Sequence, residues 1–153
     1  MGRAGGAVAF CPTSNLFLGS GLFDLARART HGIRVGLATD VGGGTSLNML
    51  RTGGEAYKVL QLNGQSLTGF RALYLATLGG AEALHLDDRI GSFRVGNEAD
   101  IAVIKTGGTP MAERRHAVAS SIEEALFVSL LVDGAQRIRA TYAAGREVMT
   151  HDA

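Results

Sequence analysis

The chain has 153 residues, of which 46% are hydrophobic and 19% charged, and this composition excludes an intrinsically disordered protein. The 15 lysines and arginines against 14 acidic residues leave a formal net charge of +1, which gives no electrostatic reason to expect a nucleic acid or an anionic membrane as partner. No apolar run reaches the roughly 20 residues of a membrane helix, and the single cysteine, Cys11, cannot form an internal disulfide. We therefore expect a soluble, cytoplasmic, globular protein.

The first forty residues predict a strand, a helix and a second strand. Residues 8–11 form a short apolar run that Pro12 ends, and residues 13–15 have the composition of a turn. A helix is expected over residues 22–31, because acidic and basic side chains lie near its start and its end respectively. Residues 33–39 are apolar enough for a buried strand, so the order predicts a parallel β-α-β unit.

Three helices are expected next. Thr45 or Ser46 caps the first, which contains two glycines that each weaken a helix by about 1 kcal/mol relative to alanine. The second begins at Thr68, and the third covers residues 81–84.

The pattern changes near residue 87. We expect one helix there, capped by Ser121, and loops over residues 106–110 and 114–116. The β elements expected there are a hairpin over residues 89–97, a strand over residues 99–105 and two strands around Gly145. The chain is thus predicted to divide into an α/β part, residues 1–86, and a small, mostly β part, residues 87–153.

Asp40 is the first candidate functional residue. It follows the second predicted strand and precedes three glycines, and the carboxyl ends of parallel strands are where α/β folds place their reaction chemistry. A carboxylate there can ligate a metal or transfer a proton. The alternative is structural, because Asp40 can also cap the next helix or hold the glycine turn.

The other polar groups favour structural roles. The glycines before Thr45 can present N–H groups to a phosphate, but the lysine of a phosphate-binding loop is absent, so a tight turn is the preferred interpretation. Cys11 is expected to be a small buried thiol rather than a nucleophile. The four histidines form no His-x-His pair and are expected at surface or helix-end positions; they are His31, His85, His116 and His151.

Several ordered strings closely resemble the guanine deaminase family of the amidohydrolase superfamily. They are FCPTSNLFLGSG at 10–21, TDVGGGTS at 39–46, EAYKV at 55–59 and YLATLGGA at 74–81. The string GNEADIAVI at 96–104 resembles the segment by which amidohydrolases return from the barrel into their small β-domain.

The resemblance implies the last two strands and helices of a metal-dependent-hydrolase (β/α)8 barrel, followed by a small β-rich domain. It implies a hydrolase that converts guanine and water to xanthine and ammonia with a divalent ion, usually zinc, that activates water. Asp40 matches the family's aspartate at the end of the eighth strand, which ligates the metal and accepts a proton from its water. Residues 11–21 match the loop after the seventh strand, near the substrate.

The sequence departs from the family in two respects, and the first is Gly53-Gly54, where the family places better helix formers. The family's metal-binding histidines and catalytic glutamate lie on earlier strands, and 153 residues are too few for a barrel of about 250. We therefore expect a C-terminal segment that is inactive alone. It is expected to form a homo-oligomer or to join a missing N-terminal half, and either partner would bury the strand residues 8–10 and 33–38. The alternatives are a non-catalytic scaffold or a related purine or pterin deaminase.

Overall fold

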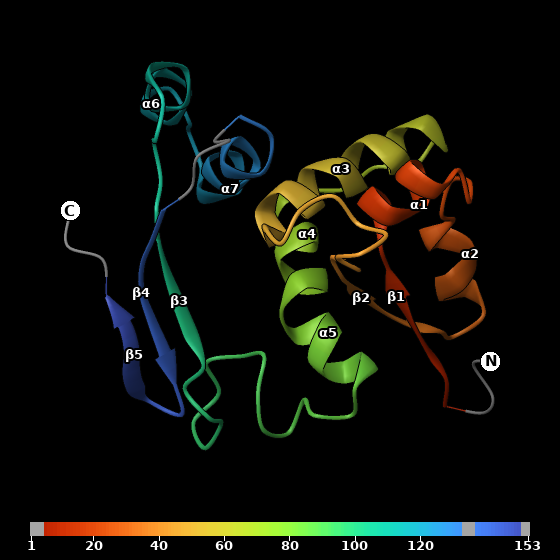
Figure 1. Ribbon diagram of the computed structural model, residues 1–153, viewed down its shortest axis with the longest axis horizontal. Helices are drawn as coiled ribbons and strands as arrows, with labels where there is room; N and C mark the ends of the chain where they lie inside the picture. The colour runs from red at the N-terminus through yellow and green to blue at the C-terminus, as the bar shows by residue number, and fades with distance from the viewer. Residues whose placement is uncertain (1–4, 133–136, 151–153) are drawn as a thin grey trace.

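The computed structural model describes residues 5–132 and 137–150 and has an α/β fold with two small sheets (Figure 1). In chain order the elements are β1 (Ala7–Phe10), α1 (Pro12–Leu18), α2 (Leu25–Thr30), β2 (Arg34–Leu37), α3 (Met49–Leu62), α4 (Gly69–Ala76), α5 (Leu78–Ala83), β3 (Ile101–Lys105), α6 (Pro110–Ala117), α7 (Ile122–Leu131), β4 (Arg137–Ala143) and β5 (Arg146–Thr150). None of the helices in the described ranges has the length and hydrophobicity required to span a bilayer.

The predicted parallel β-α-β unit is confirmed. Strands β1 and β2 pair in parallel, from Ala7 opposite Arg34 to Phe10 opposite Leu37. The predicted helix between them is α2, which begins later than expected because the Asp24 carboxylate accepts a hydrogen bond from the Arg27 N–H at 2.8 Å and so caps it.

Helix α1 was not predicted, and the turn expected over residues 13–15 is wrong. Pro12 occupies the first turn of α1, where a missing N–H costs nothing because the first helical N–H groups have no partner within the helix. Gly19 ends the helix in the left-handed conformation, with φ of 68°. The proline that ends β1 therefore also begins α1.

Helix α3 begins at Met49, later than the predicted caps at Thr45 or Ser46. Asn48 is the cap, and its Oδ1 accepts hydrogen bonds from the N–H groups of Leu50 at 2.9 Å and Arg51 at 3.1 Å. The Ser46 Oγ instead accepts from the Asn48 N–H at 3.1 Å. The predicted cap at Thr68 is confirmed for α4.

One hydrophobic core joins the parallel strands to the helices. Phe10 is fully buried and stacks on Phe23 with ring centroids 4.6 Å apart. The core further consists of buried side chains from α2, β2, α3, the following loop and α4, namely Leu25, Ala28, Val35, Leu37, Ala56, Val59, Leu60, Leu67, Ala72 and Leu75. This packing fixes β2, and thus the direction in which the chain leaves its carboxyl end.

Helix α7 packs closely on α3 because of two adjacent glycines. A Cβ atom on Gly53 would lie 2.7 Å from Leu130 Cδ2, and one on Gly54 would lie 2.5 Å from the Leu130 carbonyl oxygen. Both glycines are buried. The two glycines lower the helix propensity of α3, but their missing side chains permit a close contact between the two predicted parts of the chain.

The C-terminal region has more helix than predicted. Residues 110 and 114–116, expected in loops, lie in α6, because the Thr109 Oγ1 accepts from the Ala112 N–H at 3.2 Å and Pro110 fits the first turn. Residues 87–132 and 137–150 thus contain two helices, where one was expected. The helix capped by Ser121 is confirmed as α7, whereas residues 89–97 form turns and bends instead of a hairpin.

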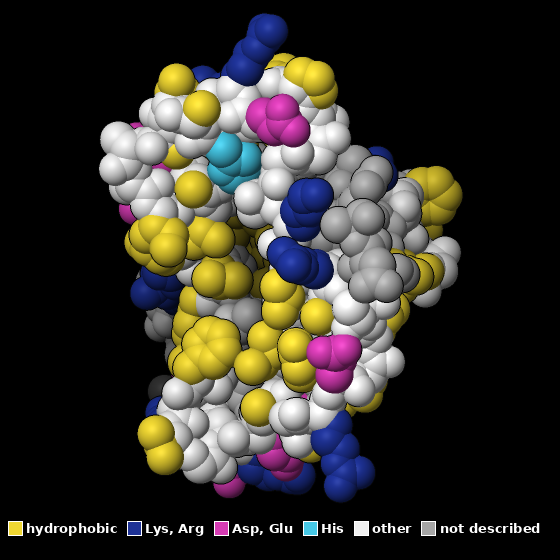
Figure 2. Space-filling model, turned by 90° about the vertical axis from the view of Figure 1, so that its left-hand side faces the viewer, with side chains coloured by type: hydrophobic (Ala, Val, Ile, Leu, Met, Phe, Trp, Pro, Cys, Tyr) yellow, Lys and Arg dark blue, Asp and Glu magenta, His cyan; other side chains and the backbone are white. Residues whose placement is uncertain are grey.

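The remaining strands form an antiparallel sheet in the order β3-β4-β5. Figure 2 shows hydrophobic side chains gathered in the middle of the side of the molecule on which this sheet lies. Its strands leave large hydrophobic side chains 38% to 61% exposed, and these are Val103, Ile104, Ile138, Val148 and Met149.

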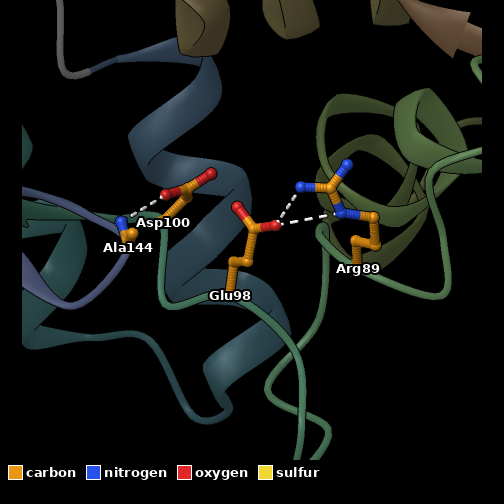
Figure 3. Close-up of polar contacts among 4 residues, drawn as sticks. All are labelled: Arg89, Glu98, Asp100 and Ala144. Atoms are coloured by element: carbon orange, nitrogen blue, oxygen red, sulfur yellow. Dashed lines mark hydrogen bonds and ion pairs between the residues drawn. The ribbon is translucent and has the colours of Figure 1, made fainter.

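Polar contacts order the chain before and within this sheet (Figure 3). The Arg89 guanidinium forms an ion pair with the Glu98 carboxylate. The Asp100 Oδ1 accepts a hydrogen bond from the Ala144 N–H at 2.8 Å. Ala144 and Gly145 have φ of 48° and 77°, which is typical of a two-residue hairpin turn and confirms the two strands predicted around Gly145.

Candidate functional site

The carboxyl ends of β1 and β2 lie side by side, because the two strands are parallel and in register. Cys11 follows β1 directly and Asp40 follows β2 after two residues. Burial raises the pKa of the Cys11 thiol, and the negative charge of Asp40 raises it further. This interaction brings together the two side chains that the sequence predicts at this end of the strands.

The main chain of Asp40 holds the glycine turn, and its side chain does not. Its φ is 49°, and its carbonyl oxygen accepts hydrogen bonds from the N–H groups of Gly43, at 3.1 Å, and Gly44. The side chain is exposed and forms no hydrogen bond or ion pair with another residue in the described ranges. Because Asn48 caps α3, the carboxylate of Asp40 is available for other chemistry.

The glycine turn is a tight turn, as predicted. The N–H groups of Gly43 and Gly44 donate to Asp40, so they are not presented to a phosphate. A Cβ atom on Gly44 would lie 1.8 Å from the Thr39 carbonyl oxygen, which no side chain permits. The resulting backbone course fixes the position of the Asp40 carboxylate relative to the strand ends.

Two residues of α1, Ser14 and Thr13, also lie at this site, as expected for the polar segment that follows the first strand. A Cβ atom on Gly43 would lie 2.7 Å from Ser14 Oγ and 3.4 Å from Asp40 Oδ2, so the hydroxyl and the carboxylate flank the same glycine. The Thr13 Oγ1 donates to the Thr39 carbonyl oxygen at 3.4 Å. The helix start at Pro12 places both hydroxyls at the carboxyl end of β1.

A shallow cavity of about 300 Å³ lies beside this site. Its walls come from α1, the loop after β2 and α3, and they combine hydroxyl, apolar and charged side chains; they are Thr13, Leu16, Phe17, Thr45, Arg51 and Glu55. Asp40 does not line this cavity, but it follows β2 at the carboxyl end of the strands, where α/β folds place catalytic groups.

The three described histidines lie away from Asp40. His31 ends α2, and the His85 Nδ1 lies 2.7 Å from the Arg34 Nη1. The His116 Nε2 lies 3.5 Å from the Ser129 Oγ. The fourth, His151, lies outside the described residues.

The described residues do not by themselves build a catalytic metal site. Such a site usually has three protein ligands and an open position. Across residues 5–132 and 137–150, no three His, Cys, Asp or Glu side chains lie together as a set that can hold a metal ion. Asp40 is thus one candidate ligand, and the donor set within this part of the chain does not fit a bound ion.

Comparison with known proteins defines the class of this fold and site. Residues 3–148 match the Amidohydrolase family, so the chain belongs to that family. It is 50% identical over 142 residues to the guanine deaminase of Escherichia coli, which covers 93% of this chain and 32% of that protein. The chain therefore spans about a third of the length of this relative.

Solved structures agree with this assignment. The structure of E. coli guanine deaminase matches 99% of this chain and 36% of its own, with a TM-score of 0.93 and 47% identity. A variant of atrazine chlorohydrolase from Arthrobacter aurescens, solved with zinc and atraton, matches 97% of this chain and 32% of its own, with a TM-score of 0.71 and 25% identity.

Proposed function

We propose that this chain is the C-terminal segment of a guanine deaminase that hydrolyses guanine to xanthine and ammonia. The observation that carries the proposal is the similarity to E. coli guanine deaminase, which extends over 93% of this chain at 50% identity. In this proposal β1 and β2 are the last two strands of a (β/α)8 barrel. Residues 1–86 are then the barrel part and residues 87–153 the small β-rich domain.

Asp40 is the residue that we propose to ligate the metal and to accept a proton when water attacks guanine. Its carboxylate follows a buried parallel strand, is exposed, and has no competing partner among the described residues. The glycine turn holds it through the main chain alone. These features leave the carboxylate accessible in a fixed place, which suits a metal ligand and a proton acceptor.

The metal in this proposal is zinc, and its other ligands come from outside residues 1–153, in the same polypeptide or in a partner chain. One carboxylate cannot supply the three protein ligands of a catalytic site. We therefore expect the chain alone to be inactive toward guanine.

The test is a chimaera in which this chain replaces the matching third of E. coli guanine deaminase. The zinc-loaded chimaera is expected to form xanthine from guanine, followed by ultraviolet absorbance. Asp40→Ala should lower kcat/KM by at least about a hundredfold, since even residues that only orient metal ligands contribute ten- to hundredfold. It should also lower the zinc content.

The matched control is Asp24→Asn, which removes a carboxylate but keeps a side-chain oxygen for the cap of α2, and Asp24 does not line the cavity of the site. This variant is expected to retain the activity of the chimaera within about twofold. A folded, zinc-containing chimaera without activity would contradict the proposed reaction. Full activity in Asp40→Ala would contradict the role of Asp40.

A further inference from the structure

A cleft of about 1000 Å³ lies at the other end of β2 from Asp40. Its walls come from α2, the amino end of β2, the loop before α4, α4 itself and α5. Arg34 begins β2 and lines the cleft, whereas Asp40 follows the end of the same strand, roughly 20 Å away at the rise of an extended chain. The cleft is thus separate from the proposed catalytic site.

The cleft carries an excess of positive charge. Arg29, Arg34 and Arg71 line it, and Glu82 is the one acidic residue among its lining side chains. The Glu82 carboxylate accepts a hydrogen bond from the Tyr74 hydroxyl at 2.5 Å. Three cations against one anion leave a formal surplus of two positive charges in one concave surface.

Two of these arginines have no partner in the described part of the chain. Arg34 is engaged, since its Nη1 donates to the Glu82 carbonyl oxygen at 3.3 Å and lies 2.7 Å from the His85 Nδ1. The guanidinium groups of Arg29 and Arg71 form no hydrogen bond or ion pair with any described residue. They come from α2 and α4, so the fold and not the local sequence brings them to one cleft.

The two unpaired arginines are close enough to repel each other. Burial lowers the pKa of Arg71, and the positive charge of Arg29 lowers it further. Both cations also act on the Tyr74 hydroxyl in the same cleft. A bound anion would relieve this repulsion, because a planar guanidinium binds an oxyanion through two parallel N–H groups.

Much of the remaining wall of the cleft is apolar, beside the polar residues Gln65, Ser66 and Thr68. Leu25, Ile33, Phe70 and Leu75 line it, and Phe70 is 48% exposed. Two guanidiniums that line one cleft can each bind an oxyanion through two parallel N–H groups and together carry two positive charges, which fits the three terminal oxygens and near-double charge of a phosphate monoester better than a single carboxylate. We propose that this cleft binds a phosphate ester, with the phosphate between Arg29 and Arg71 and an apolar body against Phe70.

The test is titration of phenyl phosphate into the 153-residue chain, followed by isothermal calorimetry at low salt. We expect saturable binding at one site, weakened by added salt. Arg29→Ala and Arg71→Ala should each weaken the binding by about tenfold or more, the effect of removing a charged hydrogen-bond donor. Inorganic phosphate should bind more weakly than phenyl phosphate, because it lacks the apolar body.

The matched control is Arg27→Ala. Arg27 lies on the same helix as Arg29 and is exposed, but it does not line the cleft. The affinity of the Arg27→Ala variant for phenyl phosphate should stay within about twofold of that of the unchanged chain. If binding depended only on the net charge of the protein, this variant would lose as much affinity as Arg29→Ala. Thermal unfolding of each variant verifies that it is folded.

Two results would overturn the proposal: no saturable binding to the folded chain, or an equal loss of affinity in Arg27→Ala and Arg71→Ala. Equal affinities for inorganic phosphate and phenyl phosphate would overturn the role of Phe70. The assay contains neither guanine nor metal, so its outcome is independent of the proposed deaminase function.

Discussion

At the scale of single residues, the effect of the Asp40 charge on the Cys11 thiol is directly testable. Because the Asp40 charge adds to burial in raising the pKa of Cys11, Asp40→Asn should lower that pKa but leave it above its ordinary value. At a fixed pH below the pKa, the variant then has more thiolate and reacts faster with iodoacetamide, at the single cysteine of the chain. Asp24→Asn is the control, and equal rates in both variants would place Asp40 too far from Cys11 to act on it.

At the scale of elements, the contact between α3 and α7 depends on the two glycines. A Cβ atom on Gly54 would meet the main-chain oxygen of Leu130, which cannot move without α7, so Gly54→Ala should destabilise the fold by about 1–3 kcal/mol. On Gly53 it would meet the end of the flexible Leu130 side chain, so Gly53→Ala should be near neutral as helix propensity offsets the strain. Urea unfolding measures both, and equal effects would contradict this account of the contact.

At the scale of the whole molecule, β1 and β2 form a two-stranded parallel sheet whose outer edges no other described strand covers. Unpaired N–H and C=O groups along strand edges favour pairing with another chain. We therefore expect the isolated chain to associate with copies of itself, and light scattering should give a mass well above 15.9 kDa that rises with concentration. A sharp monomer peak at all concentrations would show that these edges remain unpaired in solution.

The sequence by itself determined the features that depend on neighbouring residues. The parallel β-α-β unit, the caps at Thr68 and Ser121, the hairpin at Gly145 and the place of Asp40 at a strand end all follow from local patterns. The starts of α1 and α6 were missed for a local reason too, since Pro12 and Pro110 were interpreted as ends rather than first turns.

Only the tertiary structure decided which distant groups meet. In the sequence, Gly54 only lowers the helix propensity of its segment. The structure shows that the Leu130 main chain occupies the space that a side chain on Gly54 would need. Arg29 and Arg71 are 42 positions apart, and their shared cleft depends on how α2 and α4 pack beside β2. The physical reason is that capping and strand alternation are governed by residues a few positions apart, whereas packing and electrostatic repulsion depend on distances in space that the chain order does not fix.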